Sequence, residues 1–155
     1  MRKLHRPIEI LLVEDSPGDE RLMKEALKSS NISHHIAVAR DGEQALSYLR
    51  NEKEFAGCPR PDVILLDLNL PRKDGREVLA EIKEDADLKT IPVAVLTTSS
   101  AHRDIIRAYT LHANCYINKP MELEEFAKVV EAFEEFWLRT VTLPPSEAAL
   151  ADEVH

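Results

Sequence analysis

Ile8-Glu-Ile-Leu-Leu-Val-Glu-Asp15 is the stretch that decides the fold, because a run of branched apolar residues ends there on two carboxylates. A short, nearly continuous apolar run is typical of a strand that is buried on both faces, as in a parallel sheet. Ser16-Pro-Gly-Asp19 follows directly, and this combination is typical of the first turn of a helix. The opening of the chain therefore predicts one strand followed by one helix.

The same alternation continues along the chain. Further apolar runs predict strands over 35–39, 62–67, 92–97 and 115–118. Apolar residues at helical spacing predict helices around Leu22, Ala45, Val78 and Ile105, and over 122–139. A surface loop is expected over 51–61 and a turn over 71–75. Five strands that alternate with five helices predict an α/β fold with right-handed crossovers and a doubly wound parallel sheet.

The length of 155 residues, 44% of them apolar, corresponds to one ordinary domain with enough material for a core. We expect this domain over 8–140. An N-terminal segment, 1–7, precedes it, and an extension over 141–155 follows that is expected to be partly mobile.

Charge and composition exclude several classes of protein. The chain has 20 basic and 28 acidic residues, a net charge of −8, which argues against binding to nucleic acid. Apolar runs such as Val93–Leu96 are far shorter than the roughly 20 residues of a membrane span, and the charged N-terminus lacks the apolar stretch of a secretory signal. Cys58 and Cys115 are expected to be reduced thiols, which predicts a cytoplasmic protein.

Charged and polar side chains stand at the carboxyl ends of four predicted strands, the edge where such sheets bind ligands. These residues are Glu14, Asp15, Asp67, Thr97 and Lys119. Three clustered carboxylates repel one another unless a cation intervenes, and Mg²⁺ prefers oxygen ligands of this kind. A phosphoryl group would be held there by Mg²⁺, the Thr97 hydroxyl and the Lys119 ammonium. The pattern therefore predicts phosphoryl transfer onto an aspartate.

The chain resembles the receiver domains of two-component response regulators from Ile8 to Arg139. The matching segments are Leu12–Asp15, Leu65–Pro71, Asp74-Gly75, Leu96–Ser99 and Tyr116–Pro120. The resemblance implies a flavodoxin-like sheet with strand order 2-1-3-4-5 and a signalling protein rather than an enzyme. Two features depart from the family pattern: Glu14 stands where Asp is common, and the loop over 51–61 is longer than usual.

The resemblance also implies roles for individual residues. Asp67 would accept a phosphoryl group from a histidine kinase. Glu14, Asp15, Asp67 and the backbone carbonyl of Asn69 would hold Mg²⁺.

Further implied roles concern the response to phosphorylation. Thr97 and Lys119 would contact the phosphoryl group, and Tyr116 would act with Thr97 as the switch. A cis peptide bond between Lys119 and Pro120 would aim the ammonium inward. A finer resemblance, carried by Leu66–Lys83 and by the endings Phe136–Leu138 and Thr142–Pro144, points to the single-domain regulators of bacterial phytochrome kinases.

The last predicted helix carries more apolar residues than one buried face requires. Its expected core stripe is Leu123, Phe126, Val130, Phe133 and Trp137. Val129 and Phe136 lie off that stripe, which suggests a partner surface. We therefore predict a homodimer on the face formed by the fourth helix, the fifth strand and the last helix. It would use Val129, Phe136 and Trp137 and the extension Thr140–Pro145.

Three other functions fit parts of the pattern. A scaffold that never takes phosphate would not need Asp67, Thr97 and Lys119 together. An aspartyl phosphatase or mutase needs a second acid two residues after its nucleophile, where this chain has Asn69. An FMN-binding protein would offer hydroxyls and amides in the first loop, whereas Glu14 and Asp15 would repel a phosphate. No output domain is recognisable, so the signal is expected to pass by protein contact, by competition for kinase phosphate or by dimerisation.

Overall fold

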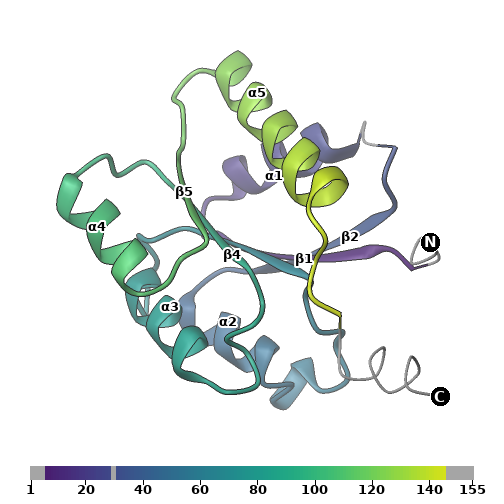
Figure 1. Ribbon diagram of the computed structural model, residues 1–155, viewed down its shortest axis with the longest axis vertical. Coiled ribbons are helices and arrows are strands. Elements are labelled where there is room, and N and C mark those ends of the chain that lie inside the picture. The colour runs from purple at the N-terminus through teal and green to yellow at the C-terminus, as the bar shows by residue number, and fades with distance from the viewer. Residues whose placement is uncertain (1–5, 29–30, 146–155) are drawn as a thin grey trace.

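The computed structural model describes residues 6–28 and 31–145 and contains one five-stranded parallel sheet (Figure 1). Its strands are β1 (Ile8–Val13), β2 (His34–Ala39), β3 (Val63–Leu66), β4 (Val93–Thr97) and β5 (Cys115–Asn118). Their order is β2-β1-β3-β4-β5, so the predicted sheet and strand order are confirmed. The predicted mobility of the tail concerns mainly 146–155, which lies outside the described residues.

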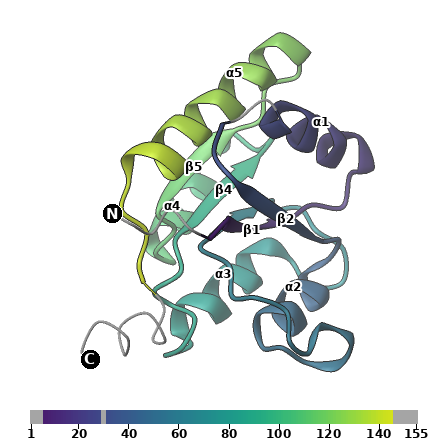
Figure 2. The ribbon, with the colours of Figure 1, turned by 90° about the vertical axis from the view of Figure 1, so that its right-hand side faces the viewer.

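Helices cover both faces of the sheet. They are α1 (Pro17–Lys28), α2 (Gly42–Leu49), α3 (Gly75–Glu84), α4 (His102–Thr110) and α5 (Leu123–Phe133). Figures 1 and 2 show α1 and α5 on one face and α2, α3 and α4 on the other. Within residues 6–28 and 31–145, no helix has both the length and the apolar character that a membrane span needs.

The core has two layers, one on each side of the sheet. In β1, Leu11 and Val13 face the layer under α2, α3 and α4, whereas Ile10 and Leu12 face α1 and α5. All four are at most 3% exposed. Successive side chains of a strand point to opposite faces, so a strand covered on both sides needs apolar residues throughout. This requirement explains the nearly continuous apolar run with which the chain opens.

The carboxyl ends of the central strands lie side by side. Val13 pairs with Leu66 across β1 and β3, and Leu66 pairs with Val95 across β3 and β4. The N–H of Asp67 then donates to the Val13 carbonyl at 3.1 Å. The loops that follow these strands therefore begin at the same edge of the sheet.

The loop after β3 ends in a capping box at the start of α3. The Asp74 carboxylate accepts from the Arg76 N–H at 3.0 Å, and the Glu77 carboxylate accepts from the Asp74 N–H at 3.2 Å. The predicted turn over 71–75 thus ends at a helix cap, and Gly75 is already the first residue of α3.

The predicted helix over 122–139 is confirmed in extent, but it is not α-helical throughout. It is α-helical to Phe133 and continues as a π-helix over Glu134–Thr140. Hydrogen bonds from residue i to i+5 widen the turns of a π-helix and shift which residues share a face. Consecutive residues Trp137 and Leu138 are consequently both buried on the side of the sheet that α1 and α5 cover.

Candidate functional site

Three carboxylates converge at the carboxyl ends of β1 and β3. Glu14, Asp15 and Asp67 each offer an oxygen, and these oxygens lie within 4.8 Å of one another. Glu14 and Asp67 are buried, whereas Asp15 is exposed. The convergence follows from the strand register, because the first two residues after β1 and the first after β3 meet at one edge.

Lys119 supplies the positive charge of this cluster. Its Nζ donates to Glu14 Oε1 at 2.6 Å, to Asp19 Oδ2 at 2.8 Å and to Asp67 Oδ2 at 3.1 Å. Asp19, in the first turn of α1, is a contact that the sequence analysis did not assign to the site. The sequence feature that could have indicated Asp19 is its place one helical turn after the acidic pair Glu14 and Asp15.

The route by which Lys119 reaches the cluster differs from the prediction. The peptide bond between Lys119 and Pro120 is trans, so the predicted cis bond is wrong. The Lys119 N–H instead donates to the Thr97 carbonyl at 2.7 Å, which extends the pairing of β4 and β5 to the edge of the sheet. This backbone contact brings the ammonium to the carboxylates.

Burial and charge act in opposite directions on the pKa values of this cluster. Burial raises the pKa of Glu14 to about 7, against the opposing hydrogen bond and charge of Lys119. Burial alone would lower the pKa of Lys119, but hydrogen bonds to Asp19 and Glu14 and the charge of Asp67 outweigh it and raise that pKa. Lys119 therefore stays an ammonium throughout the physiological range.

The donor set fits a divalent cation. When the three carboxylates are ionised, they and the Lys119 ammonium leave a net formal charge of −2 on hard oxygen ligands. Asn69 lies in the same loop, and its N–H donates to Asp67 Oδ1 at 3.2 Å, which orients that carboxylate.

Thr97 and Tyr116 lie beside this cluster, and both contact the short loop that follows β4. Thr97 is fully buried at the end of β4, and its Oγ1 accepts from the Ser99 N–H at 3.5 Å. The Tyr116 hydroxyl donates to the Ser99 carbonyl at 2.9 Å, and Asn118 Nδ2 donates to the same oxygen at 2.7 Å. The loop that follows Thr97 is thus attached to β5 through Tyr116.

Comparison with known proteins identifies the family. Residues 10–131 match the family model of the response regulator receiver domain. The chain belongs to this family. The receiver domain is 56% identical over 138 residues to response regulator Rcp1 from a Synechocystis species, a match that covers 89% of this chain and 94% of Rcp1. It is 44% identical over 132 residues to the probable methanogenesis regulatory protein FilR2 of Methanothrix harundinacea, covering 85% of this chain and 84% of that protein.

Solved structures show the same relationship. The Mn²⁺-bound form of Rcp1 is 55% identical and superposes with a TM-score of 0.88, over 90% of this chain and all of that one. The phosphorylated cyanobacterial phytochrome response regulator RcpA is 54% identical, with the same TM-score and the same coverage. This receiver domain is therefore a homologue of phytochrome response regulators, and the related Rcp1 has been solved with Mn²⁺ bound.

Gly75 is a further residue of the receiver site whose contribution the sequence analysis missed. A Cβ atom at this position would lie 2.3 Å from the Asp67 carbonyl oxygen and 2.6 Å from Leu68 Cα. Helix α3 therefore packs directly against the backbone of the loop after β3. The sequence showed a glycine in a turn, but not its distance from Asp67.

The residues predicted for a receiver dimer divide into buried and exposed ones. Trp137 is 8% exposed and packs in the core, as its place in the expected core stripe predicts. Val129 is half-buried against the same core, so neither residue offers the exposed surface that the predicted dimer would use. Phe136 is 51% exposed, and its ring lies edge-on to Trp137 at a centroid distance of 5.3 Å. Leu123, predicted for the core stripe, is instead 63% exposed because it begins α5.

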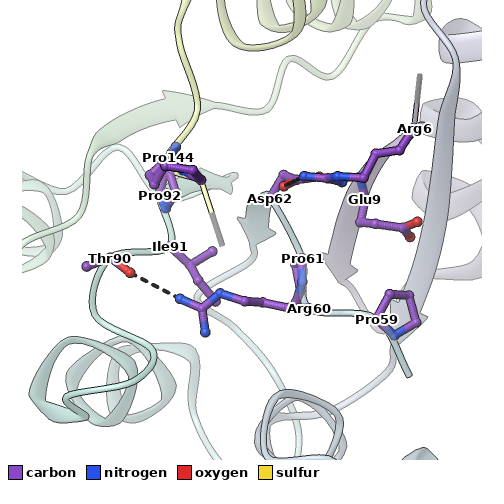
Figure 3. Close-up of a pocket in the computed structure, with 11 residues that line it drawn as sticks. Arg6, Glu9, Pro59, Arg60, Pro61, Asp62, Thr90, Ile91, Pro92 and Pro144 are labelled. Atoms are coloured by element: carbon purple, nitrogen blue, oxygen red, sulfur yellow. Dashed lines mark hydrogen bonds and ion pairs between the residues drawn. The ribbon is translucent and has the colours of Figure 1, made fainter. Parts of the chain in front are cut away.

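A hollow of about 230 Å³ lies at the opposite edge of the sheet from the carboxylate cluster, where the strands begin (Figure 3). Its polar groups are already paired: Arg6 donates two hydrogen bonds to Asp62, at 2.9 and 2.8 Å, and Arg60 donates to Thr90 at 3.0 Å. Pro144 covers one side, so the hollow is where the C-terminal extension packs across the sheet edge. It contains none of the predicted site residues of the receiver.

Proposed function

We propose that Asp67 accepts a phosphoryl group from a histidine kinase. The observation that carries this proposal is the setting of its carboxylate, which accepts from Lys119 Nζ at 3.1 Å and shares a cluster with Glu14 and Asp15. Asp19 also contacts Lys119 but lies on α1, outside that cluster. Asp67 therefore lies at the end of the central strand, between the Lys119 ammonium and the carboxylates of the cluster.

The transfer requires attack by one Asp67 oxygen on phosphorus while the bond from phosphorus to the kinase histidine nitrogen breaks. The Asn69 N–H holds Oδ1 at 3.2 Å and limits the orientations of the carboxylate. Lys119 offers its charge to the incoming phosphoryl oxygens, and the Thr97 hydroxyl offers a hydrogen bond.

Mg²⁺ is the cation that we assign to the site. Asp15, Asp67 and the backbone carbonyl of Asn69 would hold it, with Glu14 acting through a water molecule. When bound, Mg²⁺ neutralises charge on the phosphoryl oxygens and the carboxylates. The hard oxygen donors and the net charge of the cluster support this assignment.

The response to phosphorylation would start at Thr97. A phosphoryl group on Asp67 would draw the Thr97 hydroxyl toward it, and Tyr116 would rotate into the vacated space. The face formed by α4, β5 and α5 would change as a result, which is a two-state element biased by local contacts. The hydrogen bond from Tyr116 to the Ser99 carbonyl supports this proposal. Ser99 also contacts Thr97 through its N–H, so it links the two switch residues.

The partner we propose is a phytochrome-type histidine kinase in the cytoplasm. Identity of 56% to Rcp1 and of 54% to the phytochrome response regulator RcpA supports this assignment. The receiver would act by protein contact rather than by catalysis or by binding nucleic acid, and a net charge of −8 agrees with that expectation. Exposed Phe136 and the exposed Ile106 and Tyr109 of α4 support a homodimer on the same face.

Substitution of Asp67 tests the proposal. In Asp67→Asn, acid-labile phosphate from a kinase or from acetyl phosphate should fall to background, while circular dichroism remains that of the wild type. Labelling of wild type should also be lost in EDTA and return with MgCl₂. Asp87→Asn, at an exposed acid outside the cluster, is the matched control and should label normally. Full labelling of Asp67→Asn would overturn the assignment and favour a scaffold or another acceptor.

A further inference from the structure

Arg76 and Asp104 join the two loops that flank the proposed phosphorylation site. Arg76 lies in the first turn of α3 and Asp104 in the first turn of α4. Arg76 Nε donates to Asp104 Oδ1 at 3.1 Å, and its Nη2 lies 2.9 Å from Oδ2. Both side chains are only 17% exposed. The pair therefore has the two-point geometry that gives an arginine–carboxylate contact its directional strength.

Each partner also contacts the loop on its own side. Arg76 Nη1 donates to Asp74 at 3.0 Å and, less closely, to the Leu68 carbonyl at 3.4 Å, next to Asp67. Asp104 Oδ2 accepts from the Ser99 hydroxyl at 2.6 Å. The pair thus extends from the residue after Asp67 to the loop after Thr97.

Ser99 connects the pair to Tyr116. Its hydroxyl is held by Asp104, while its carbonyl accepts from the Tyr116 hydroxyl at 2.9 Å. The Ser99 hydrogen bond and the Arg76 contact both lower the pKa of Asp104, so the carboxylate keeps its charge and holds both partners at neutral pH. Arg103 and Arg107 line the hollow beside this pair and add further positive charge near Asp104.

We propose that Arg76 is a positioning residue. Through Asp104, it holds the loop that follows Thr97, here called the Ser99 loop, in the arrangement in which the Tyr116 hydroxyl donates to the Ser99 carbonyl. This inference rests on the proposed switch and identifies the Arg76–Asp104 pair as a contact that restrains it. Movement of Thr97 toward a phosphoryl group displaces the Ser99 loop, and the Arg76–Asp104 pair opposes that displacement. The pair thereby sets how much free energy the phosphoryl group must supply before Tyr116 turns.

The test uses the full chain with beryllofluoride and saturating MgCl₂ as the probe. The Tyr116 ring signal is followed by NMR in protein with labelled tyrosine, and Tyr116→Phe assigns it among the three tyrosines. Arg76→Gln and Asp104→Asn should each lower the beryllofluoride concentration for half conversion about 3- to 10-fold. The double variant should match either single variant, because both break the same pair.

Two further variants separate positioning from simple folding effects. Arg103→Gln removes a neighbouring guanidinium outside the hydrogen-bonded pair and should titrate like the wild type. Arg76→Lys keeps the charge but cannot make the two-point contact, and should lie between wild type and Arg76→Gln. Without beryllofluoride, the Tyr116 signal of Arg76→Gln should already be displaced toward its bound position, which a loss of stability alone would not produce.

The outcomes distinguish this inference from the function on which it rests. A wild type that shows no Mg²⁺-dependent response to beryllofluoride overturns the proposed switch and the inference together. A responding wild type with unchanged Arg76→Gln and Asp104→Asn overturns only the inference. A higher concentration for half conversion in these variants also overturns it, because the pair would then stabilise the switched arrangement.

Discussion

Lys119 occupies a position that is costly for a charge unless it is paired, since its side chain is 4% exposed and contacts three carboxylates. Removing the ammonium would leave Glu14 and Asp67 buried beside each other without the Lys119 charge that both carboxylates now contact. The loss of one partner from a buried ion pair is strongly destabilising, because the other charges remain uncompensated.

We therefore expect Lys119→Met to lower the free energy of unfolding by about 3 kcal/mol at neutral pH, measured by urea denaturation. Saturating MgCl₂ should recover part of this loss, because a cation bound at the cluster replaces the missing charge. Lys128→Met is the control: Lys128 is 71% exposed and pairs with exposed Glu125, so its change should stay within about 0.5 kcal/mol. Equal losses in the two variants would contradict the electrostatic account.

At the scale of elements, the close packing of α3 on the loop after β3 positions Asp67. Gly75 permits this contact, since any Cβ would meet the Asp67 carbonyl at 2.3 Å and either the helix or the loop would have to move. Gly18 in α1 offers a matched comparison, because a Cβ there would meet only Ser16 Oγ at 3.9 Å.

Gly75→Ala should lower the free energy of unfolding by about 2 kcal/mol and slow phosphorylation of Asp67 by roughly tenfold or more. Gly18→Ala should be neutral or more stable by up to about 1 kcal/mol, because alanine favours the helix and meets no obstacle. Denaturation curves and initial labelling rates measure the two effects. If Gly75→Ala labels at the wild-type rate, α3 does not position the acceptor loop.

At the scale of the whole molecule, Glu20 ties α1 to the loop after β2. Its carboxylate lies 2.9 Å from Lys24 Nζ and 2.6 Å from Arg40 Nη1, and the residue is buried. The hydrogen bond from Lys24, with that from Arg40, lowers the pKa of Glu20 below its usual 4.5. A lowered pKa in the folded state contributes stability above the unfolded value, and that stability is lost as pH falls through the folded pKa.

Glu20→Gln should therefore be less stable than wild type by about 1 kcal/mol at neutral pH, and the gap should close as pH falls below 4.5. Urea denaturation across this range gives the comparison. Glu25→Gln should differ little from wild type at any pH, because Glu25 is 64% exposed and lies 3.6 Å from an exposed lysine. A gap that persists in acid would show that the effect of Glu20 is not ionic.

Self-association is the other property of the whole molecule that we expect. Burial of the exposed Phe136 side chain could contribute about 1.5 to 3 kcal/mol per subunit before association costs, which favours a micromolar dimer. Analytical ultracentrifugation should show a dimer that strengthens with beryllofluoride and is lost in Phe136→Asp. Ala56→Asp adds the same charge on the opposite side of the sheet, beyond α2, and should leave association intact. Wild type that remains monomeric at high concentration in both states would end the proposal.

Much of the fold could be predicted from local pattern. Apolar runs that end on Glu14, Asp67 and Thr97 identify strands and the edge where their ends meet, because a parallel strand covered on both faces needs apolar residues throughout. The helix over 122–139 was predicted with one regular period, and its change to π-helical turns was not visible in that pattern. Burial of both Trp137 and Leu138 depends on how that segment packs against the sheet.

The sequence by itself determined the doubly wound sheet, the convergence of the acidic residues with Lys119, and the family. The sheet and the convergence follow from periodicity and from residue types at strand ends, which are local properties, and the family follows from motifs that resemble those of receiver domains. Only the tertiary structure decided that Lys119 reaches Asp19, that Gly75 contacts Asp67, and that Arg76 binds Asp104. These contacts join different loops and helices, and their distances depend on how helices dock on the sheet, which no local pattern encodes.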